Sequence, residues 1–592
     1  MRVSWERGRL ARSGEAAKGE GELRSPALYP PASPLRASRP RSQPILVSGL
    51  LLMMSVPAVA EPPPRNPFLV DGVAQMTHFE PAQQDALPIP GPTGERDVRA
   101  EDIQRLPGGV GNGMALNAAP YPGGVEVMWV VNAGRVAKLR VDGGRFEELA
   151  RYELGGEGLV DAAAAERFTA ALDAAADEAA LIAVVRRDYP YWLERVVART
   201  GIYTLVDRDG LFYTIARDRI LVLGDRDPGD PRSPIELKRE WRIPDGILSD
   251  WRLRWWALRR WWAGEIPVRA AGERPTLGQM VEILHDAGIG LGMTWDGHLV
   301  LTTISGAVAV VDRHFRQPPH VVRLAGEAIT NSFAVDAAGG IYVVTDRRMH
   351  KLAWTGRRLS RDAADGAWSE PYARSDGPHG GIRAGSGGSG STPTLMGFGP
   401  DQDRLVVITD GAAVMNLVAF WRDAVPPGGT RLADQIAVTI GLAAPTAVQS
   451  EQSVVVWEEG AFVVNNVGPD TLPSALENVV AIGVTRPPPR GVERFAWDRA
   501  AHRWRRTWAR PDVASPSCVP VMSPVTRQVY VQSAEDGRFE ILGLDWDSGA
   551  TRTRWRLPKS QAFNGAYMLV QFLADGDIAM GMLTGPVRIS PR

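Results

Sequence analysis

The sequence predicts an all-β protein, a β-propeller of seven or eight blades that carries a small helical insertion. The first observation behind this prediction is a β-hairpin pattern that recurs eight times between residues 125 and 582. The second is a content of 62 Gly and 46 Pro, which supplies frequent turns between short strands. The third is the length of 592 residues, which one repeat architecture can absorb because each unit packs only on its neighbours.

The recurring hairpin consists of a turn with Asp, Gly or Asn, a short β-rich run, a polar turn and a second run. Eight such units contain too many strands for a sandwich, and parallel β-helices repeat at shorter periods, so the pattern favours a propeller. The copies lie at residues 125–134, 207–222, 295–310, 336–346, 401–411, 453–460, 526–533 and 575–582.

A second pattern follows several hairpins, where an Asp closes one strand and a bulky residue ten positions later opens the next. The Asp can bond the backbone of the turn, and the bulky side chain can pack between adjacent sheets. The pairs are Asp142 and Tyr152, Asp312 and Val322, Asp498 and Trp508, and Asp545 and Trp555.

The N-terminal region has the layout of an export signal. Residues 1–44 lack hydrophobic periodicity, and an apolar run at 45–56 is followed by the small-residue sequence 58–60, Ala-Val-Ala. We therefore expect a disordered leader plus signal peptide at 1–60, with cleavage after Ala60 and a periplasmic or secreted location. The remaining chain divides into an extended segment at 61–105 and the propeller at 106–592.

The last unit of the propeller contains only three strands, at 565–574, 577–583 and 586–589, before the chain ends. An unpaired outer edge favours aggregation, so a closed ring requires a fourth strand from elsewhere in the chain. The sequence predicts that the extended segment supplies this strand from between Asn66 and Leu106.

Two insertions interrupt the β pattern, at 157–197 and 247–287, and both contain helix formers at helical spacing. In the second, Trp251, Trp255, Leu258 and Trp262 form one stripe, with arginines largely off it. Such a helix can cap the propeller, contact a membrane interface peripherally, or bind a partner. We favour capping because the stripe is short.

Candidate ligand-binding residues precede the innermost strand of each blade, because that position rings one mouth of a propeller channel. They are mostly neutral and polar, so they either contact a ligand or satisfy backbone groups in turns. The set is Asn112, Asn331, Ser332, Thr392, Thr446, Ser517, Cys518 and Asn564.

Signals for a metal or a nucleophile are weak. The eight histidines include no pair at zinc-ligand spacing, and no Gly-x-Ser-x-Gly motif is present. The residues themselves predict no cofactor. Calcium is a candidate only through the resemblance of the Asp-Gly hairpins to gluconolactonase-type propellers, which would make Asn331, Asn564, Asp346 and Asp410 its ligands. Cys518 is either a channel nucleophile or an inert buried thiol.

Charge and cysteine content restrict the partners. Residues 1–60 hold nine of the 67 basic and four of the 68 acidic side chains, so the rest of the chain is net acidic. This balance argues against nucleic-acid binding. One cysteine cannot form an intramolecular disulfide.

The segment 544–555, with Asp545 and Ser548 in the turn, resembles the docking motif of quinoprotein (PQQ-like) propellers. The Asp-Gly hairpins resemble those of gluconolactonase-type (SMP-30-like) propellers, and both resemblances cover about residues 105–592 and concern the fold. They imply a dehydrogenase or a lactonase with a divalent metal in the channel. Quinoprotein alcohol dehydrogenases carry a vicinal cysteine disulfide, which this chain cannot form.

Because the predicted ring is mostly neutral, the sequence favours an exported module that binds a small molecule or an envelope protein. A lactonase-like hydrolase is the alternative, and a quinone-dependent dehydrogenase is the third possibility. Catalysis would require charged groups that converge in a cleft.

Overall fold

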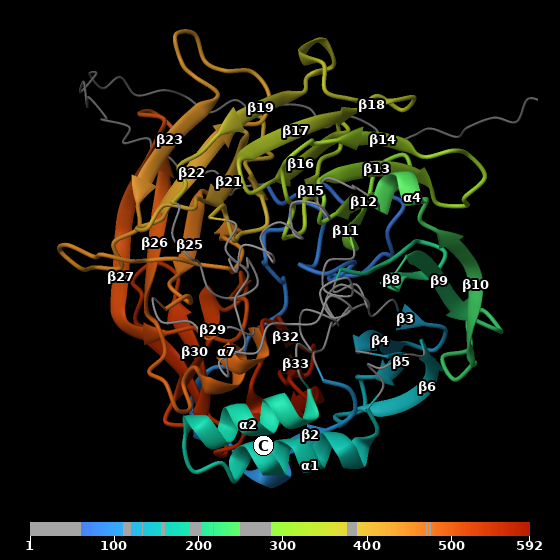
Figure 1. Cartoon of the computed structure of the whole chain (residues 1–592), viewed down its shortest axis with the longest axis vertical. Helices are drawn as coiled ribbons and strands as arrows, with labels where there is room; N and C mark the ends of the chain where they lie inside the picture. The colour runs from blue at the N-terminus through green and yellow to red at the C-terminus, as the bar shows by residue number, and fades with distance from the viewer. Residues whose placement is uncertain are drawn as a thin grey trace, which may run out of the picture. The chain divides into compact units, whose positions relative to one another are not determined.

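The computed structural model describes residues 61–110, 120–132, 134–154, 160–189, 203–216, 218–248, 286–375, 387–468, 472 and 475–591. Within these ranges the strands form eight sheets, which are arranged around a common centre as the blades of a propeller (Figure 1). The predicted fold class is therefore confirmed, and the number of blades is eight.

Blades 1 to 4 each run from an inner first strand to an outer last strand, with antiparallel neighbours. In blade 4, β18 and β19 both pair with β17. Blade 1 contains β3 (Pro120–Tyr121), β4 (Val125–Asn132), β5 (Arg135–Arg140) and β6 (Glu147–Glu153); blade 2 contains β7 (Leu205–Val206), β8 (Phe212–Ala216), β9 (Arg219–Asp225) and β10 (Ile235–Arg242); blade 3 contains β11 (Gly288–Met293), β12 (His298–Thr303), β13 (Ala307–Asp312) and β14 (His320–Arg323); blade 4 contains β15 (Ala334–Val335), β16 (Gly340–Val344), β17 (Arg348–Trp354), β18 (Leu359–Ser360) and β19 (Trp368–Pro371).

Blades 5 to 8 follow the same order, and the last two each gain a strand from the N-terminal segment. Blade 5 contains β20 (Thr394–Met396), β21 (Leu405–Thr409), β22 (Asn416–Trp421) and β23 (Leu432–Ala437); blade 6 contains β24 (Val455–Trp457), β25 (Gly460–Val464), β26 (Arg490–Asp498) and β27 (Arg503–Ala514); blade 7 contains β28 (Val521–Ser523), β29 (Gln528–Glu535), β30 (Arg538–Asp545), β31 (Thr551–Arg556) and β1 (Gly94–Asp97); blade 8 contains β32 (Val570–Phe572), β33 (Ile578–Met582), β34 (Gly585–Ile589) and β2 (Ile103–Arg105).

The ring closes through these two N-terminal strands. β2 pairs antiparallel with β34 and becomes the outer strand of blade 8, with Ile103 opposite Ile589. β1 pairs in parallel with β31 and extends blade 7 to five strands. The fourth strand of the last blade thus comes from the region of the chain that the sequence predicts, and the adjoining blade gains a strand as well.

The Asp-Gly hairpins owe their shape to one recurring set of hydrogen bonds. The Oδ1 atom of Asp336 accepts from the backbone amides of Ala338 and Gly340, and its Oδ2 atom accepts from the Tyr342 hydroxyl at 2.7 Å. Asp207 makes the equivalent bond to the Tyr213 hydroxyl, at 2.9 Å, in blade 2. The Asp therefore satisfies turn amides and ties the turn to the second strand of the blade.

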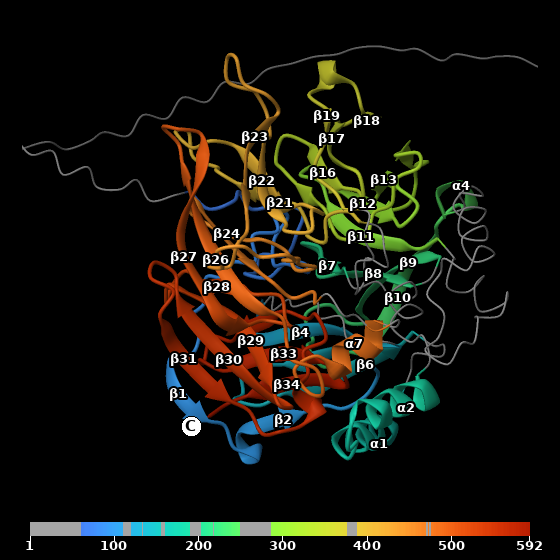
Figure 2. The same cartoon turned by 60° about the vertical axis from the view of Figure 1, so that its left-hand side comes forward.

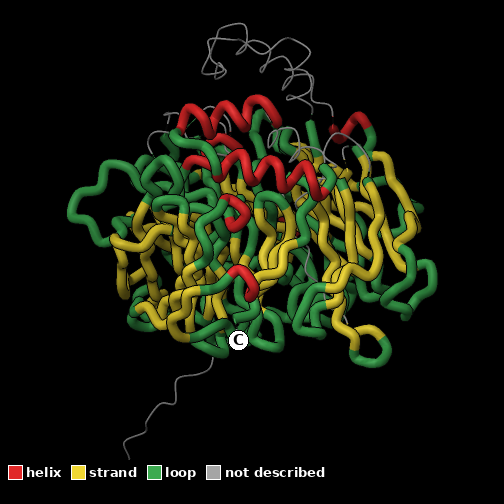
Figure 3. The backbone as a smooth tube through the Cα atoms, turned by 90° about the horizontal axis from the view of Figure 1, so that it is seen from below, coloured by secondary structure: helices red, strands yellow, loops and turns green. Residues whose placement is uncertain are grey.

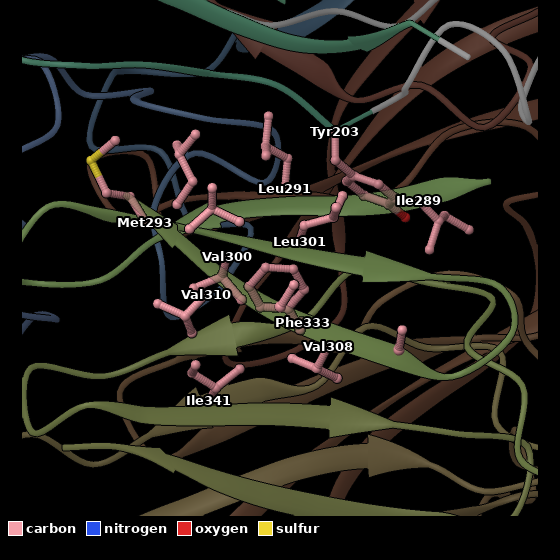
Figure 4. Close-up of a cluster of buried hydrophobic side chains, with 14 of the residues drawn as sticks. Tyr203, Ile289, Leu291, Met293, Val300, Leu301, Val308, Val310, Phe333 and Ile341 are labelled. Carbon is pink, nitrogen blue, oxygen red and sulfur yellow. The ribbon is translucent and has the colours of Figure 1, made fainter. Parts of the chain in front are cut away.

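The apolar core lies between neighbouring blades. Figure 4 shows Phe333, from the entry to blade 4, beside Val300 and Val308 of blade 3. The inner strand of blade 3 contains glycine where this ring approaches, because a Cβ on Gly290 or Gly292 would lie 2.8 Å from the ring of Phe333. The two glycines on the inner strand of blade 3 thus allow blades 3 and 4 to pack closely.

Hydrogen bonds also connect neighbouring blades. The Trp508 side chain donates through Nε1 to the carbonyl of Trp546 in the next blade, at 2.9 Å. Asp545 and Ser548, which carry the quinoprotein-like pattern, form the turn between β30 and β31, where Asp545 Oδ1 accepts from the Ser548 amide and hydroxyl. This segment therefore has a structural role in the turn between two strands.

The helices gather along one face of the ring (Figure 3). The first insertion forms α1 (Ala162–Asp173) and α2 (Glu178–Asp188), and α7 (Ala475–Ala481) is an insertion in blade 6 that the sequence does not predict. Their apolar sides pack together through Phe168, Leu181, Val480 and neighbouring residues. Short helical turns lie at η1 (Ala100–Asp102), η2 (Ala363–Asp365), η4 (Gln561–Phe563) and α4 (Asp245–Leu248).

The tryptophan stripe of the second insertion, Trp251, Trp255 and Trp262, lies outside the described residues. Among the residues that are described, no helix has the length and the apolar composition needed to cross a membrane.

Candidate functional site

Residues 66–92, named here the channel segment, run through the centre of the propeller, where Figures 1 and 2 show them as a blue trace within the ring of blades. Four of its carbonyl groups accept hydrogen bonds of 2.8 to 3.0 Å from the inner strands of four consecutive blades. The donor amides are Val335, Leu395, Val456 and Met522, and the acceptors are Pro81, Ala82, Gln84 and Asp85.

The channel segment reaches these blades through a compact turn with an unusual backbone. His78, Phe79, Gln83 and Asp85 all have positive φ angles, between 54° and 71°. Non-glycine residues rarely adopt this conformation, and clusters of such residues often mark functional sites. The Glu80 carboxylate accepts from the backbone amides of the same turn at Ala82 and Gln84.

Two titratable side chains of this turn are paired inside the channel. The Nδ1 atom of His78 lies 2.7 Å from Oδ1 of Asp85, and both side chains are buried. Burial raises the pKa of Asp85, and the neighbouring His78 opposes this increase. Glu80 keeps some exposed surface, yet burial of its carboxyl raises its pKa to about 7.

Tyr203 connects this pair to residues of the predicted ring. Its ring stacks on that of His78, with centroids 5.9 Å apart, and its hydroxyl donates to Oδ1 of Asn331 at 3.4 Å. Burial raises the pKa of Tyr203 to about 12, while Thr392 and the backbone of Ser332 act in the opposite direction. Three predicted residues therefore meet around one aromatic side chain.

A second polar group lies at the entries to blades 6, 7 and 8. The Tyr567 hydroxyl donates to Oε2 of Glu451 at 3.3 Å, and the Tyr567 amide donates to the Ser517 carbonyl. Gln452 donates through Nε2 to the carbonyl of Ser515 at 3.1 Å. Ser517 therefore contributes its backbone to this group.

Several buried polar atoms of these two groups have no hydrogen-bond partner among the described residues. They belong to side chains that are no more than 1% exposed. A buried polar atom without a partner costs free energy, so such atoms in a native fold usually mark a bound molecule or water. In the group formed by the channel segment and Tyr203, the atoms are Gln83 Oε1, Asp85 Oδ2, Ser332 Oγ and Thr392 Oγ1, and in the second group they are Gln452 Oε1, Asn466 Nδ2 and Ser515 Oγ.

Two predicted residues occupy other positions. Thr446 is exposed in the loop that follows β23, where it meets neither polar group. Asn564 is buried and donates to the carbonyl of Val479 at 2.7 Å, while its Oδ1 accepts from Ala566. Its side chain therefore anchors α7 to blade 8. Asn112 lies outside the described residues.

Cys518 is fully buried, and its Sγ donates to Oε1 of Gln532 at 3.2 Å. Burial raises the pKa of the thiol well above its ordinary value. The thiolate is the nucleophilic form of cysteine, so this environment suppresses its reactivity.

The four calcium candidates do not form one site. Asp346 accepts from the backbone amide of Ala328 at 2.8 Å, and Asp410 accepts from the Asn416 side chain at 2.6 Å. Asn331 meets Tyr203, whereas Asn564 anchors α7. Within the described part of the chain, no group of three His, Cys, Asp or Glu side chains is arranged to hold a metal ion.

His78, Asp85 and Tyr203 are not among the residues that the sequence predicts for the site. Tyr203 precedes the inner strand of blade 2 by two residues, so the rule that gave the ring residues would have found it at the hairpin of 207–222. His78 and Asp85 lie in a segment without strand or helix periodicity, and only the folded chain brings them to the channel.

No protein-family model matches the chain. An uncharacterized protein of Archaeoglobus fulgidus is 35% identical over 318 residues, which are 51% of this chain and 60% of that relative. The chain thus spans about three fifths of the length of the curated relative it matches.

Solved structures resemble the chain at the level of the fold alone. A quinohemoprotein alcohol dehydrogenase of Comamonas testosteroni is 11% identical, with a TM-score of 0.46, over 88% of this chain and 78% of that chain. The C-terminal WD40 domain of Sif2 is 8% identical, with a TM-score of 0.43, over 83% and 99%. At these similarities, the propeller assignment rests on the eight sheets of this chain itself.

Proposed function

We propose that the protein is an exported propeller that binds a small polar molecule in its channel, beside the channel segment. The observation that carries the proposal is the set of unpartnered buried atoms that accompanies the His78–Asp85 pair. Polar groups are buried without partners at a free-energy cost, and a ligand that completes their hydrogen bonds would recover it. Carbonyl, carboxylate and hydroxyl groups would orient such a ligand.

Export is supported by the apolar run at 45–56 and by the sequence that follows it. Residues 61, 62, 64 and 65 are exposed, whereas Asn66 is buried and donates to the Met293 carbonyl at 3.0 Å. Cleavage after Ala60 would therefore leave the contacts of the channel segment in place. N-terminal sequencing of the protein from periplasmic and cytoplasmic fractions tests this part of the proposal, and a chain that keeps residues before Glu61 would contradict it.

The binding function is tested by thermal-shift screening of the chain against a panel of neutral, cationic and anionic metabolites. A ligand should raise the melting temperature, because it binds the folded state alone. The matched variant Ser332→Ala removes an unpartnered hydroxyl and should weaken binding with little effect on the fold. If no compound shifts the melting temperature of the wild-type chain, the function is a different one.

A hydrolase is the second candidate, and one observation favours it. A histidine whose Nδ1 is held by a carboxylate keeps its Nε2 for proton transfer, which is how many general bases are arranged. Hydrolysis of a panel of lactones and esters by the wild-type chain, with His78→Gln as the inactive control, separates catalysis from binding. Turnover that survives in His78→Gln would exclude this residue as the base.

A further inference from the structure

Two of the three titratable side chains in the turn of the channel segment are acidic, namely Glu80 and Asp85. The basic side chain that contacts the Asp85 carboxyl is His78, at 2.7 Å. Within the described ranges, neither Asp85 nor Glu80 forms an ion pair with a Lys or Arg. Charges in a low-dielectric interior interact strongly, so an anionic ligand would be repelled here.

The unpartnered atoms also favour one type of ligand. In the group formed by the channel segment and Tyr203, Gln83 Oε1 and the Oδ2 atom of an ionised Asp85 carboxyl can only accept hydrogen bonds. The hydroxyls of Ser332 and Thr392 can serve either role. Acceptors therefore outnumber donors, and the complementary ligand is rich in N–H or O–H groups.

An aromatic surface lies beside these acceptors. Tyr203 and His78 stack with an angle of 23° between their rings, and both belong to the same group as Asp85. The face of an aromatic ring attracts a cation, most strongly where water is excluded. A carboxylate next to a tyrosine ring is thus suited to an ammonium group more than to a neutral hydroxyl.

On this basis, and resting on the binding function proposed above, we propose that the ligand is a small organic cation whose protonated amine is held by the Asp85 carboxylate and the neighbouring acceptor oxygens. The amine supplies the donors that Gln83 and Asp85 lack, and its charge compensates the acidic side chains of the turn. Phosphorylated or carboxylated substrates are disfavoured for the same reason.

Three probes with one five-carbon skeleton test the class of ligand, namely cadaverine, 1,5-pentanediol and glutarate. Thermal shift and calorimetric titration of the wild-type chain at pH 7.5 should show binding of cadaverine at least tenfold tighter than that of the diol, and no binding of glutarate. Asp85→Asn should weaken cadaverine at least tenfold. Asp97→Asn makes the same change of charge at a side chain that is 77% exposed in β1, and it should leave binding unchanged.

The outcomes separate this inference from the proposed function. Tighter binding of the diol or of glutarate overturns the amine and leaves the binding function standing. Unchanged cadaverine affinity in Asp85→Asn overturns the role of the carboxylate. Failure of all three probes, together with failure of the metabolite panel, overturns both proposals. If Asp85→Asn does not fold, the three probes on the wild-type chain still decide the class.

Discussion

His78 and Asp85 form a buried pair at the centre of the propeller, with 2.7 Å between Nδ1 and Oδ1. They are seven residues apart in the chain, and the turn that joins them has left-handed backbone at both. The backbone carbonyl of Asp85 also accepts from Met522 in blade 7. The pair is therefore held by both the turn and the ring.

Replacing His78 with Leu should destabilise the fold by about 3 kcal/mol at pH 8, because the Asp85 carboxylate is left buried without its partner. The loss should be smaller at pH 5, since burial raises the pKa of Asp85 and the carboxyl can then take up a proton. Denaturant unfolding at both pH values measures the effect. The double variant with Asp85→Asn should be more stable than the sum of the single losses predicts, and strict additivity would show that the two side chains are not coupled.

Glu80 should make the stability of the protein depend on pH between about 5 and 7. Its pKa is raised from 4.5 to about 7, so the folded state binds a proton that the unfolded state has lost. The stabilising contribution is complete below pH 4.5 and is lost as the pH rises through 7. The stability of the wild-type chain relative to Glu80→Gln should therefore fall from pH 5 to pH 8, and a constant difference between the two chains would contradict the raised pKa.

Deleting residues 61–105 should abolish cooperative folding. The deletion removes β1, β2 and the channel segment, with six large apolar side chains that contribute roughly 1.5–3 kcal/mol each. That total is comparable to the whole stability of a typical domain, about 5–15 kcal/mol. The side chains are Leu69, Val70, Met76, Phe79, Leu87 and Val98. Calorimetry compares this deletion with the removal of the mostly exposed residues 61–64, which should have little effect. A shortened chain as stable as the parent would show that the ring holds without the segment.

Asn564→Ala should loosen α7, because the bonds to Val479 and Gln561 are lost and buried groups stay unpaired. We expect a cost of about 1–3 kcal/mol and faster hydrogen exchange within 475–481. Thr446→Ala is the control, since this exposed side chain should matter by less than about 0.5 kcal/mol. Equal protection of α7 in both variants would argue against an anchoring role for Asn564.

Cys518 should not react with iodoacetamide in the folded protein and should be fully alkylated in urea. Burial of the thiol and its raised pKa both suppress the thiolate. Mass spectrometry after timed labelling measures the reaction. Rapid alkylation of the native chain would show that the Cys518 thiol is accessible and reactive, as expected of a channel nucleophile.

The hairpins could be predicted because their determinants are local. Asp336 and Tyr342 are six residues apart, and the same spacing recurs at Asp207 and Tyr213. The missing fourth strand of blade 8 could also be inferred, because an open edge has a physical cost that a closed ring avoids. The strand that closes blade 8 is β2 (Ile103–Arg105), which lies at the C-terminal end of the predicted range 66–106.

The course of the channel segment could not be predicted in this way. Residues 66–92 form no regular strand pattern, and their hydrogen bonds reach partners more than 200 residues away, such as Leu395 and Met522. The sequence does not predict α7 for a similar reason, because this short helix is stabilised by packing on α1 and α2 more than by its own sequence. The position of Asn331 and Asn564 before an inner strand can be predicted from the sequence. Their hydrogen-bond partners cannot, because only the folded chain brings Tyr203 to Asn331 and Val479 to Asn564.

The pairing of β2 with β34 and of β1 with β31 determines when the molecule can be completed. A chain is synthesised from its N-terminus, so the first two strands exist long before their partners. Blades 1 to 6 can form in succession once their own strands are present, whereas blades 7 and 8 must wait for β31 and β34. During this interval residues 94–105 have unpaired edges, and a chaperone that shields them until these partners are present would raise the yield of folded protein.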